Sequence, residues 1–173
     1  MNWQTIVKKY PEANFLQSPS YAKMNELLGN KIIIKNFNNA GYALLIVRNA
    51  KRGRYIEIPC GPLIDWKDQA LVKEFMSEIT KEAKNEHCVF IRIRPQLLIS
   101  NENLKLLENL GFKKSPMHLA AEHTVMIDLN QSEESLLKNM RRQTRYEVRR
   151  ASKLGIIVKK STDEKVFREF HKI

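Results

Sequence analysis

The sequence has little of what would place the protein in a membrane or in an oxidising compartment. It contains only two cysteines, Cys60 and Cys88, which lie in or beside apolar, strand-like runs and lack CxxC spacing. No uncharged run approaches the roughly 20 residues that a membrane-spanning helix requires, and the first residues contain no apolar signal core. We therefore expect buried free thiols and a cytoplasmic protein.

The motifs of several enzyme classes are also missing. The chain contains no GxSxG, GxGxxG or P-loop sequence, and none of its histidines is spaced as a metal ligand with a partner on one helical face. The Arg/Gln-x-x-Gly-x-Gly/Ala turn that holds the pyrophosphate of acetyl-CoA is absent too, which argues against a CoA-dependent N-acyltransferase. The sequence thus predicts neither a metal site nor a bound cofactor.

Acidic residues are scarce relative to basic ones. The 30 Lys and Arg residues exceed the 19 Asp and Glu residues, which gives a net charge of +11 and a pI near 9.7. This excess favours anionic partners such as nucleic acid, nucleotide phosphates or an anionic membrane surface. The length of 173 residues suits one domain, or one domain and a fragment of another.

Hydrophobic periodicity and turn residues predict an α/β chain with a mixed sheet and flanking helices. We expect a boundary near residues 117–122, because strand and helix signals restart there. The last helix stops mid-pattern, so we also expect a truncated chain. A turn at 38–41 joins the first two strands, and Asp65 is the expected cap of the long helix. The expected helices are 2–9, 19–28, 66–85, 102–110, 138–153 and one from Ser161, and the expected strands are 31–37, 42–48, 54–58, 88–94, 124–129 and 156–159.

The most distinctive segment, residues 138–160, contains a single acid, Glu147. On an α-helix five of its nine cations fall on one face, and Leu137, Met140, Thr144, Val148 and Ala151 fall on another. Periodicity leaves open whether the cations bind a polyanion or are solvated surface, and whether the helix breaks near 142–144. The cationic face consists of Lys138, Arg142, Arg145, Arg149 and Lys153, of which those from Arg142 onward would survive a break.

Four further polar residues stand out on predicted elements. Arg92 and Arg94 share one face of a strand whose surroundings should hide both faces, so they need an anion, an acidic partner or water. A structural ion pair and a phosphate or carboxylate clamp both satisfy this need. Tyr21 and Asn25 share a helix face, and spacing alone indicates that they are surface residues.

Four runs, in this order, resemble the Fem family (FemABX-like) of peptidoglycan bridge-forming aminoacyltransferases. They are FLQSPSYAKMNELLG, CGPLIDWKD, FIRIRP and LLKNMRRQTRYEVRRASKLGI, and the resemblance covers residues 3–173. It implies two acyltransferase-like (GNAT-like) domains. Residues 1–121 would form most of the first domain, and residues 122–173 would begin the second.

The resemblance implies that an amino acid moves from aminoacyl-tRNA to the side-chain amine of a peptidoglycan precursor, either lipid II or a UDP-linked muropeptide. These substrates are the implied partners, with peripheral contact to the inner face of the membrane. The chain has Asn25 where the family often has lysine, and Arg94 where it often has aspartate, so the acceptor is left open. A non-catalytic basic RNA-binding module and a small-molecule N-acyltransferase are the alternatives.

The chemistry of this reaction makes few demands on cofactors. An aminoacyl ester is already activated, so neither ATP, a metal nor a covalent enzyme intermediate is required, and the general base is not identified. Both substrates are polyanions, so positive charge serves binding. We expect the 173-residue chain alone to be inactive. The predicted substrate-binding residues are Tyr21, Asn25, Arg92, Arg94, Arg142, Arg145, Arg149 and Lys153.

Overall fold

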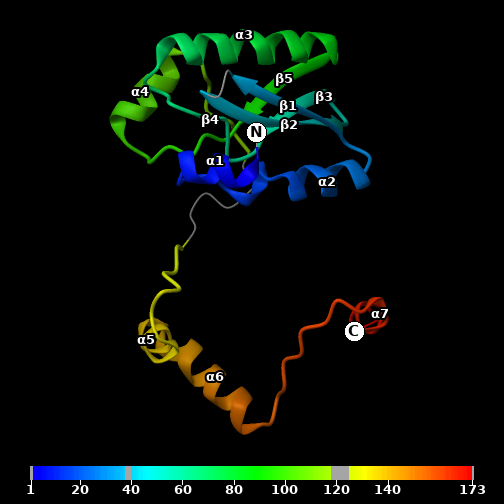
Figure 1. Cartoon of the computed structure of the whole chain (residues 1–173), viewed down its shortest axis with the longest axis vertical. Coiled ribbons are helices and arrows are strands. Elements are labelled where there is room, and N and C mark those ends of the chain that lie inside the picture. The colour runs from blue at the N-terminus through cyan, green and yellow to red at the C-terminus, as the bar shows by residue number, and fades with distance from the viewer. Residues whose placement is uncertain (1, 38–39, 118–124, 173) are drawn as a thin grey trace. The chain divides into compact units, whose positions relative to one another are not determined.

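The computed structural model of the chain describes residues 2–37, 40–117 and 125–172. It divides into two compact units, Met1–Met117 and His118–Ile173 (Figure 1). No helix in the described ranges combines the length and the apolar character that a bilayer crossing demands.

The described part of the first unit is built on a mixed five-stranded sheet. β2 is antiparallel to β1, β3 and β4, whereas β3 and β5 are parallel, and the pairing path is β1-β2-β3-β5. Because parallel neighbours need a crossover, helix α3 (Gln69–Asn85) connects this pair. The strands are β1 (Lys31–Phe37), β2 (Gly41–Ala50), β3 (Gly53–Ile58), β4 (Leu63–Ile64) and β5 (Cys88–Ile93).

Helices cover both faces of this sheet (Figure 1). Helices α1 (Trp3–Lys9) and α2 (Pro19–Leu27) lie on one face, with the short 3-10 helix η1 (Phe15–Gln17) between them in sequence. Helices α3 and α4 (Asn101–Asn109) lie on the other. Each α-helix of this unit begins where a polar side chain accepts a hydrogen bond from a first-turn N–H. These caps are Asn2, Ser18, Asp68 and Ser100.

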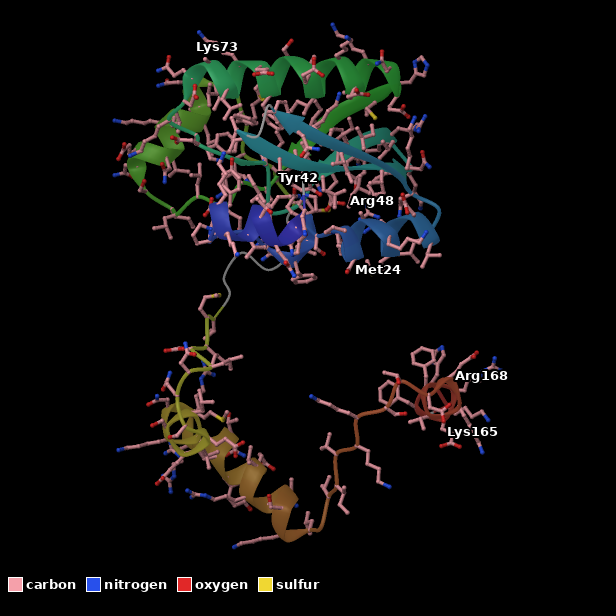
Figure 2. All side chains as sticks on the ribbon, viewed as in Figure 1. Met24, Tyr42, Arg48, Lys73, Lys165 and Arg168 are labelled. Carbon is pink, nitrogen blue, oxygen red and sulfur yellow. The ribbon has the colours of Figure 1, made fainter. Side chains whose placement is uncertain are left out.

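Side chains alternate between the two faces of β2, which gives the unit two separate cores. Ala43, Leu45 and Val47 pack with Phe75 and Ile79 of α3. Tyr42, on the opposite face, lies in the layer between the sheet and helices α1 and α2 (Figure 2). This second core consists of Ile6, Tyr10, Ala22, Tyr42, Leu44 and Leu63.

A buried glutamine fills the gap in the sheet between the end of β3 and the start of β4, which both pair with β2. Gln17 is fully buried, and its Nε2 donates to the carbonyls of Pro59 at 2.6 Å and Leu44 at 3.4 Å. Its Oε1 accepts from the backbone N–H of Leu44 at 2.8 Å. Gly61 makes room for this amide, since a Cβ there would lie 2.6 Å from the Gln17 side chain. The side chain thus replaces a missing strand residue beside β2.

The predicted α/β class with a mixed sheet is confirmed, but details of the first unit differ. The long helix begins at Gln69 with Asp68 as its cap, so the prediction of Asp65 is wrong. Trp66 is buried against Phe112 instead of opening the helix. The two-residue strand β4 has no periodic signal and was not predicted, and the predicted turn at 38–41 falls partly outside the described residues.

The second unit contains three helices within residues 125–172, and none of them has a buried residue. The prediction of a continuous helix from residue 138 is wrong, because extended backbone at Met140 separates two helices. No residue of the apolar face expected to pack is buried, and Val148 is 43% accessible. The helices are α5 (Glu133–Asn139), α6 (Arg142–Lys153) and α7 (Glu164–Phe170).

Two predicted strands of the second unit are not formed. Residues 125–129 and 156–159 make no strand pairing, and residue 124 lies outside the described ranges. A strand needs a hydrogen-bonded neighbour, and the described part of this unit supplies none. The last helix also begins later than predicted, at Glu164, because Asp163 rather than Ser161 caps it.

Candidate functional site

An aromatic pair occupies the sheet face at β3 and β5. The rings of Tyr55 and Phe90 are stacked, with centroids 4.7 Å apart and planes 12° from parallel. Alternation along β5 explains their placement, because Ile91 and Ile93 pack in the core under α3 and turn Phe90 to the opposite face. Phe90 is 42% exposed, so this part of the face is open to solvent.

The guanidinium group of Arg92 rests on these two rings. Its Cζ lies 5.8 Å from the centroid of Tyr55 and 5.7 Å from that of Phe90, a cation–π arrangement that favours a fixed position. In residues 2–37, 40–117 and 125–172, no group forms an ion pair or hydrogen bond with the guanidinium group of Arg92. The structure therefore fixes the guanidinium with rings and leaves its N–H donors available to an anion.

The carboxylate on the neighbouring strand is already engaged. Glu57 is the register partner of Arg92 across β3 and β5, but its Oε2 accepts a hydrogen bond from Nε of Arg48 at 2.8 Å. Arg48 projects on the same face as Tyr42, between the sheet and the helix layer (Figure 2). With two arginines and one carboxylate, this part of the face carries a net positive charge.

Arg94 follows β5 and extends its pairing. Its backbone N–H donates to the carbonyl of Ile58 at 3.1 Å, and its carbonyl accepts from the N–H of Gly61 at 3.0 Å. Burial raises the pKa of the Cys60 thiol, and the nearby Arg94 charge only partly opposes this rise. Cys60 therefore stays protonated and is a poor nucleophile. The expectation of a buried free thiol is therefore confirmed for Cys60, whereas Cys88 is only partly buried.

Tyr21 and Asn25 do not form a polar surface patch on α2. Asn25 is fully buried, and its Nδ2 donates to the carbonyl of Tyr21 at 2.9 Å. Its Oδ1 accepts from Nδ2 of Asn30 at 3.5 Å, so its polar groups serve the end of the helix. Tyr21 is half-buried and packs edge-on against Phe15. The expectation from spacing that Asn25 lies on the surface is wrong, and a role for it in substrate binding stays a prediction.

Three cations of α6 are exposed and unneutralised. Glu147, the acid of the segment, accepts a hydrogen bond from Gln143 at 2.7 Å and lies 4.0 Å from Nη1 of Arg150. It therefore leaves the predicted cationic face without an internal carboxylate partner in the described ranges. Within α6, the exposed cations that form no ion pair with a described residue are Arg142, Arg149 and Lys153.

Arg145 has a structural task that periodicity did not reveal. Its Nη1 donates to the carbonyls of Lys138 at 2.9 Å and Met140 at 2.6 Å. Carbonyls at the end of a helix lack intrahelical partners, so Arg145 stabilises the break between α5 and α6. The face that remains begins at Arg142, as the broken-helix alternative predicted, and Lys138 lies on a different helix.

Comparisons with known proteins identify relatives over nearly the whole chain. The model of the FemAB family matches residues 2–173. Aminoacyltransferase FemA of Staphylococcus aureus (strain bovine RF122 / ET3-1) is 25% identical over 189 residues, covering 92% of this chain and 45% of the relative. Aminoacyltransferase FemA of Staphylococcus epidermidis is 28% identical over 163 residues, covering 79% of this chain and 39% of that relative.

A solved structure shows the same fold. The crystal structure of FemX matches 96% of this chain with a TM-score of 0.74 and 22% sequence identity. The match covers 45% of the FemX chain. The chain thus spans about half the length of FemX and of the S. aureus relative.

Proposed function

We propose that this chain, which belongs to the FemAB family, takes part in transferring an amino acid to the side-chain amine of a peptidoglycan precursor. Its relatives are named aminoacyltransferases. The chain spans 45% of one of them, and we assign it a share in substrate binding. The division into a first domain at 1–121 and the start of a second at 122–173 is part of this proposal.

The proposed donor is aminoacyl-tRNA, and the proposed acceptor is lipid II or a UDP-linked muropeptide. The acceptor amine attacks the ester carbonyl, the bond between that carbon and the ribose oxygen breaks, and the tRNA leaves. A lysine-type amine has a pKa of about 10.4 and must lose a proton before it attacks. None of the described residues is assigned as the proton acceptor. The chain's own contribution is to hold two phosphate-bearing substrates near each other.

The observation that supports the proposal most strongly is the state of Arg92. A guanidinium fixed on two rings, with donors free of carboxylate partners in the described ranges, suits phosphate in charge and geometry. Fixing it beforehand lowers the entropy that binding would otherwise cost. Arg92 would therefore contact the diphosphate of the precursor.

Calorimetric titration with a UDP-linked muropeptide tests this assignment. We expect Arg92→Ala to weaken binding about 10- to 100-fold, since a hydrogen bond to a charged group contributes roughly 1.5–3 kcal/mol. Arg52→Ala, which removes an exposed arginine from the turn between β2 and β3, is the matched control and should bind like the parent chain. Equal affinity of the Arg92→Ala variant and the parent chain would remove Arg92 from the site.

A non-catalytic RNA-binding module is the second candidate, because the free cations of α6 suit any RNA backbone. A mass-spectrometric transfer assay with charged tRNA and muropeptide distinguishes the two. If tRNA binds in a salt-sensitive manner but the muropeptide neither binds nor gains mass, the RNA-binding module is correct. Binding of the muropeptide through Arg92 favours the FemAB-type reaction.

A further inference from the structure

Three charged residues lie on one face of the sheet, on three neighbouring strands. They are Arg48 of β2, Glu57 of β3 and Arg92 of β5. The strand registers define this face, because Glu57 is the partner of Arg92, and Arg48 is the partner of Tyr55, whose ring lies under the Arg92 guanidinium. Register partners share a face of a sheet. One carboxylate therefore lies on the strand between two arginines.

The carboxylate of Glu57 pairs with Arg48 and not with Arg92. Its Oε2 accepts a hydrogen bond from Nε of Arg48 at 2.8 Å. Only 16% of the Glu57 side chain and 23% of the Arg48 side chain are exposed. Glu57 forms no other ion pair within residues 2–37, 40–117 and 125–172. Because neighbouring strands are about 4.8 Å apart, Arg92 is also within reach of this carboxylate, and the observed pair is one of two that the sheet allows.

Removal of Arg48 would leave a largely buried carboxylate without its partner. Such a group is costly unless another cation or donor satisfies it. Arg92 is the cation next to Glu57 on the neighbouring strand, and its guanidinium has no ion pair or hydrogen bond in the described part of the chain. Without Arg48, Glu57 would therefore take up the donors that are otherwise available to a phosphate.

We propose that Arg48 is a positioning residue for anion binding: by holding Glu57, it keeps the guanidinium donors of Arg92 available to a phosphate group. This inference rests on the proposed function, in which Arg92 contacts the diphosphate of the precursor. Arg48 acts here through Glu57 and does not touch the ligand. Its effect on binding therefore depends on the presence of the Glu57 carboxylate.

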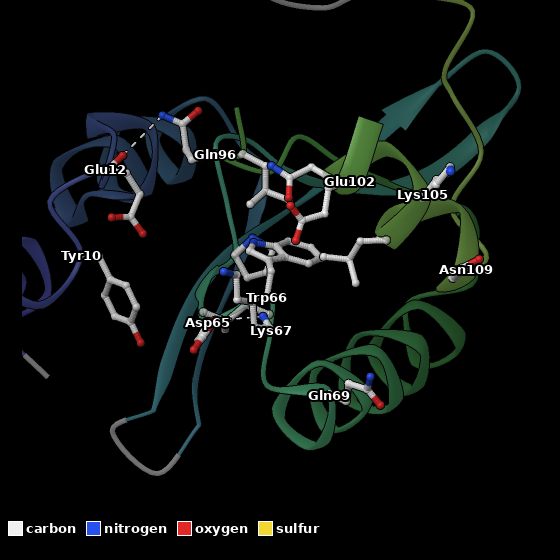
Figure 3. A pocket seen from close by; sticks show the side chains of 15 residues that line it. Tyr10, Glu12, Asp65, Trp66, Lys67, Gln69, Gln96, Glu102, Lys105 and Asn109 are labelled. Atoms are coloured by element: carbon white, nitrogen blue, oxygen red, sulfur yellow. Dashed lines mark hydrogen bonds between the residues drawn. The ribbon is translucent and has the colours of Figure 1, made fainter. Parts of the chain in front are cut away.

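The first unit also contains a cavity of about 700 Å³, which none of these three residues lines. Trp66, Glu102 and Lys105 are among the side chains around it (Figure 3). Its carboxylates outnumber its lysines, so it favours an anion less than the face at Arg92 does. Lys105 nevertheless supplies a control for binding in this second place. The charged residues of the cavity are Glu12, Asp65, Lys67, Glu102 and Lys105.

Calorimetric titration with inorganic pyrophosphate tests the inference, because this probe carries the diphosphate without the rest of the precursor. We expect Arg48→Met to weaken binding at least about 5-fold, and Arg48→Met/Glu57→Gln to restore the affinity of the parent chain, since a neutral amide competes poorly for a guanidinium. Lys105→Met is the matched control for the loss of one positive charge and should bind like the parent chain. Equal affinity of Arg48→Met and the parent chain, or no recovery in the double variant, would overturn the inference.

Nitrogen NMR of the Arg92 side chain separates a hydrogen bond from a general effect of charge. In the ligand-free protein, the guanidinium N–H signals that Arg92→Lys removes should exchange with water more slowly in Arg48→Met than in the parent chain, because Glu57 then accepts from them. The double variant should return the exchange rate to that of the parent chain. An exchange rate that is the same in all three proteins would show that Arg48 acts by its charge alone, which would contradict the positioning role.

A calorimetric titration with the UDP-linked muropeptide separates this inference from the proposed function. If both hold, Arg92→Ala and Arg48→Met each weaken binding, and Glu57→Gln restores it in the second variant. If only Arg92→Ala does so, the phosphate contact stands and the role of Arg48 falls. If the parent chain does not bind the muropeptide, the proposed function falls, and the pyrophosphate experiment alone decides on Arg48.

Discussion

The two units of the chain present their cations in different ways. In the first, Arg92 lies on stacked rings above a sheet whose cores are fully buried. In the second, Arg142 and Arg149 extend from a helix without a buried residue. The first arrangement favours one ligand geometry, whereas the second offers charge with little geometric selection. The comparison teaches that the packing around a cation, and not its sequence spacing, decides which kind of anion it can select.

The largest expected effect concerns the cores. Phe75 is fully buried between the sheet and α3, so Phe75→Ala should lower the free energy of unfolding by about 3–5 kcal/mol. Val148→Ala, at an exposed apolar position of α6, should change it by less than about 0.5 kcal/mol. Urea denaturation followed by circular dichroism measures both. A large loss in the Val148 variant would mean that the second unit has a core after all.

The next effect tests the buried amide of the first unit. Gln17→Leu would leave the N–H of Leu44 and the carbonyl of Pro59 unpaired, and each such group costs about 1–3 kcal/mol. We expect a loss of about 2–4 kcal/mol in the same denaturation experiment. Gln4→Leu, at an exposed position of α1, should be nearly neutral. Equal stability of the two variants would show that the amide is not needed to complete the sheet.

A smaller effect concerns the cations of α6. In tRNA binding, Arg142→Gln/Arg149→Gln should reduce the slope of log K against log salt by nearly 2, because each phosphate contact contributes about 0.9. Arg150→Gln is the matched control, since Arg150 lies beside Glu147. Fluorescence anisotropy at several salt concentrations gives the slopes. Identical slopes for the double variant and the parent chain would show that this face does not contact RNA.

The smallest effect is a pH dependence of the first unit. Hydrogen bonds from Lys31 at 2.5 Å and Arg54 at 3.2 Å lower the pKa of Glu86. Because the pKa of Glu86 is lower in the folded state, its ionised form stabilises the fold at pH values above its unfolded-state pKa of about 4.3. This stabilisation disappears as the pH falls through the folded-state pKa. Glu86→Gln should therefore flatten the dependence of stability on pH below about 5. An unchanged pH profile would contradict the assignment.

Sequence patterns predicted the elements that local signals define. The bounds of β1 match the predicted strand, and α3 ends at Asn85 as predicted. Interactions between distant segments gave no such signal. Gln17 bonds to Leu44 and Pro59, and nothing in the local sequence of Gln17 marks it for this role.

The candidate site shows the same division. Alternation placed Arg92 opposite Ile91 and Ile93, but only the register of β3 and β5 reveals Tyr55 and Phe90 beneath its guanidinium. Helical spacing grouped Arg145 with the other cations of the predicted face. Its hydrogen bonds to the end of α5, however, depend on the break at Met140. Spacing therefore found the cations, and three-dimensional packing separated the available ones from the structural one.

The most direct measurement of the central claim is a phosphorus NMR titration of the UDP-linked muropeptide. We expect the two diphosphate resonances to shift on addition of the parent chain or of Arg52→Ala, and to shift much less at the same concentration of Arg92→Ala. Resonances that move equally with all three proteins would contradict the assignment of Arg92 as the phosphate contact.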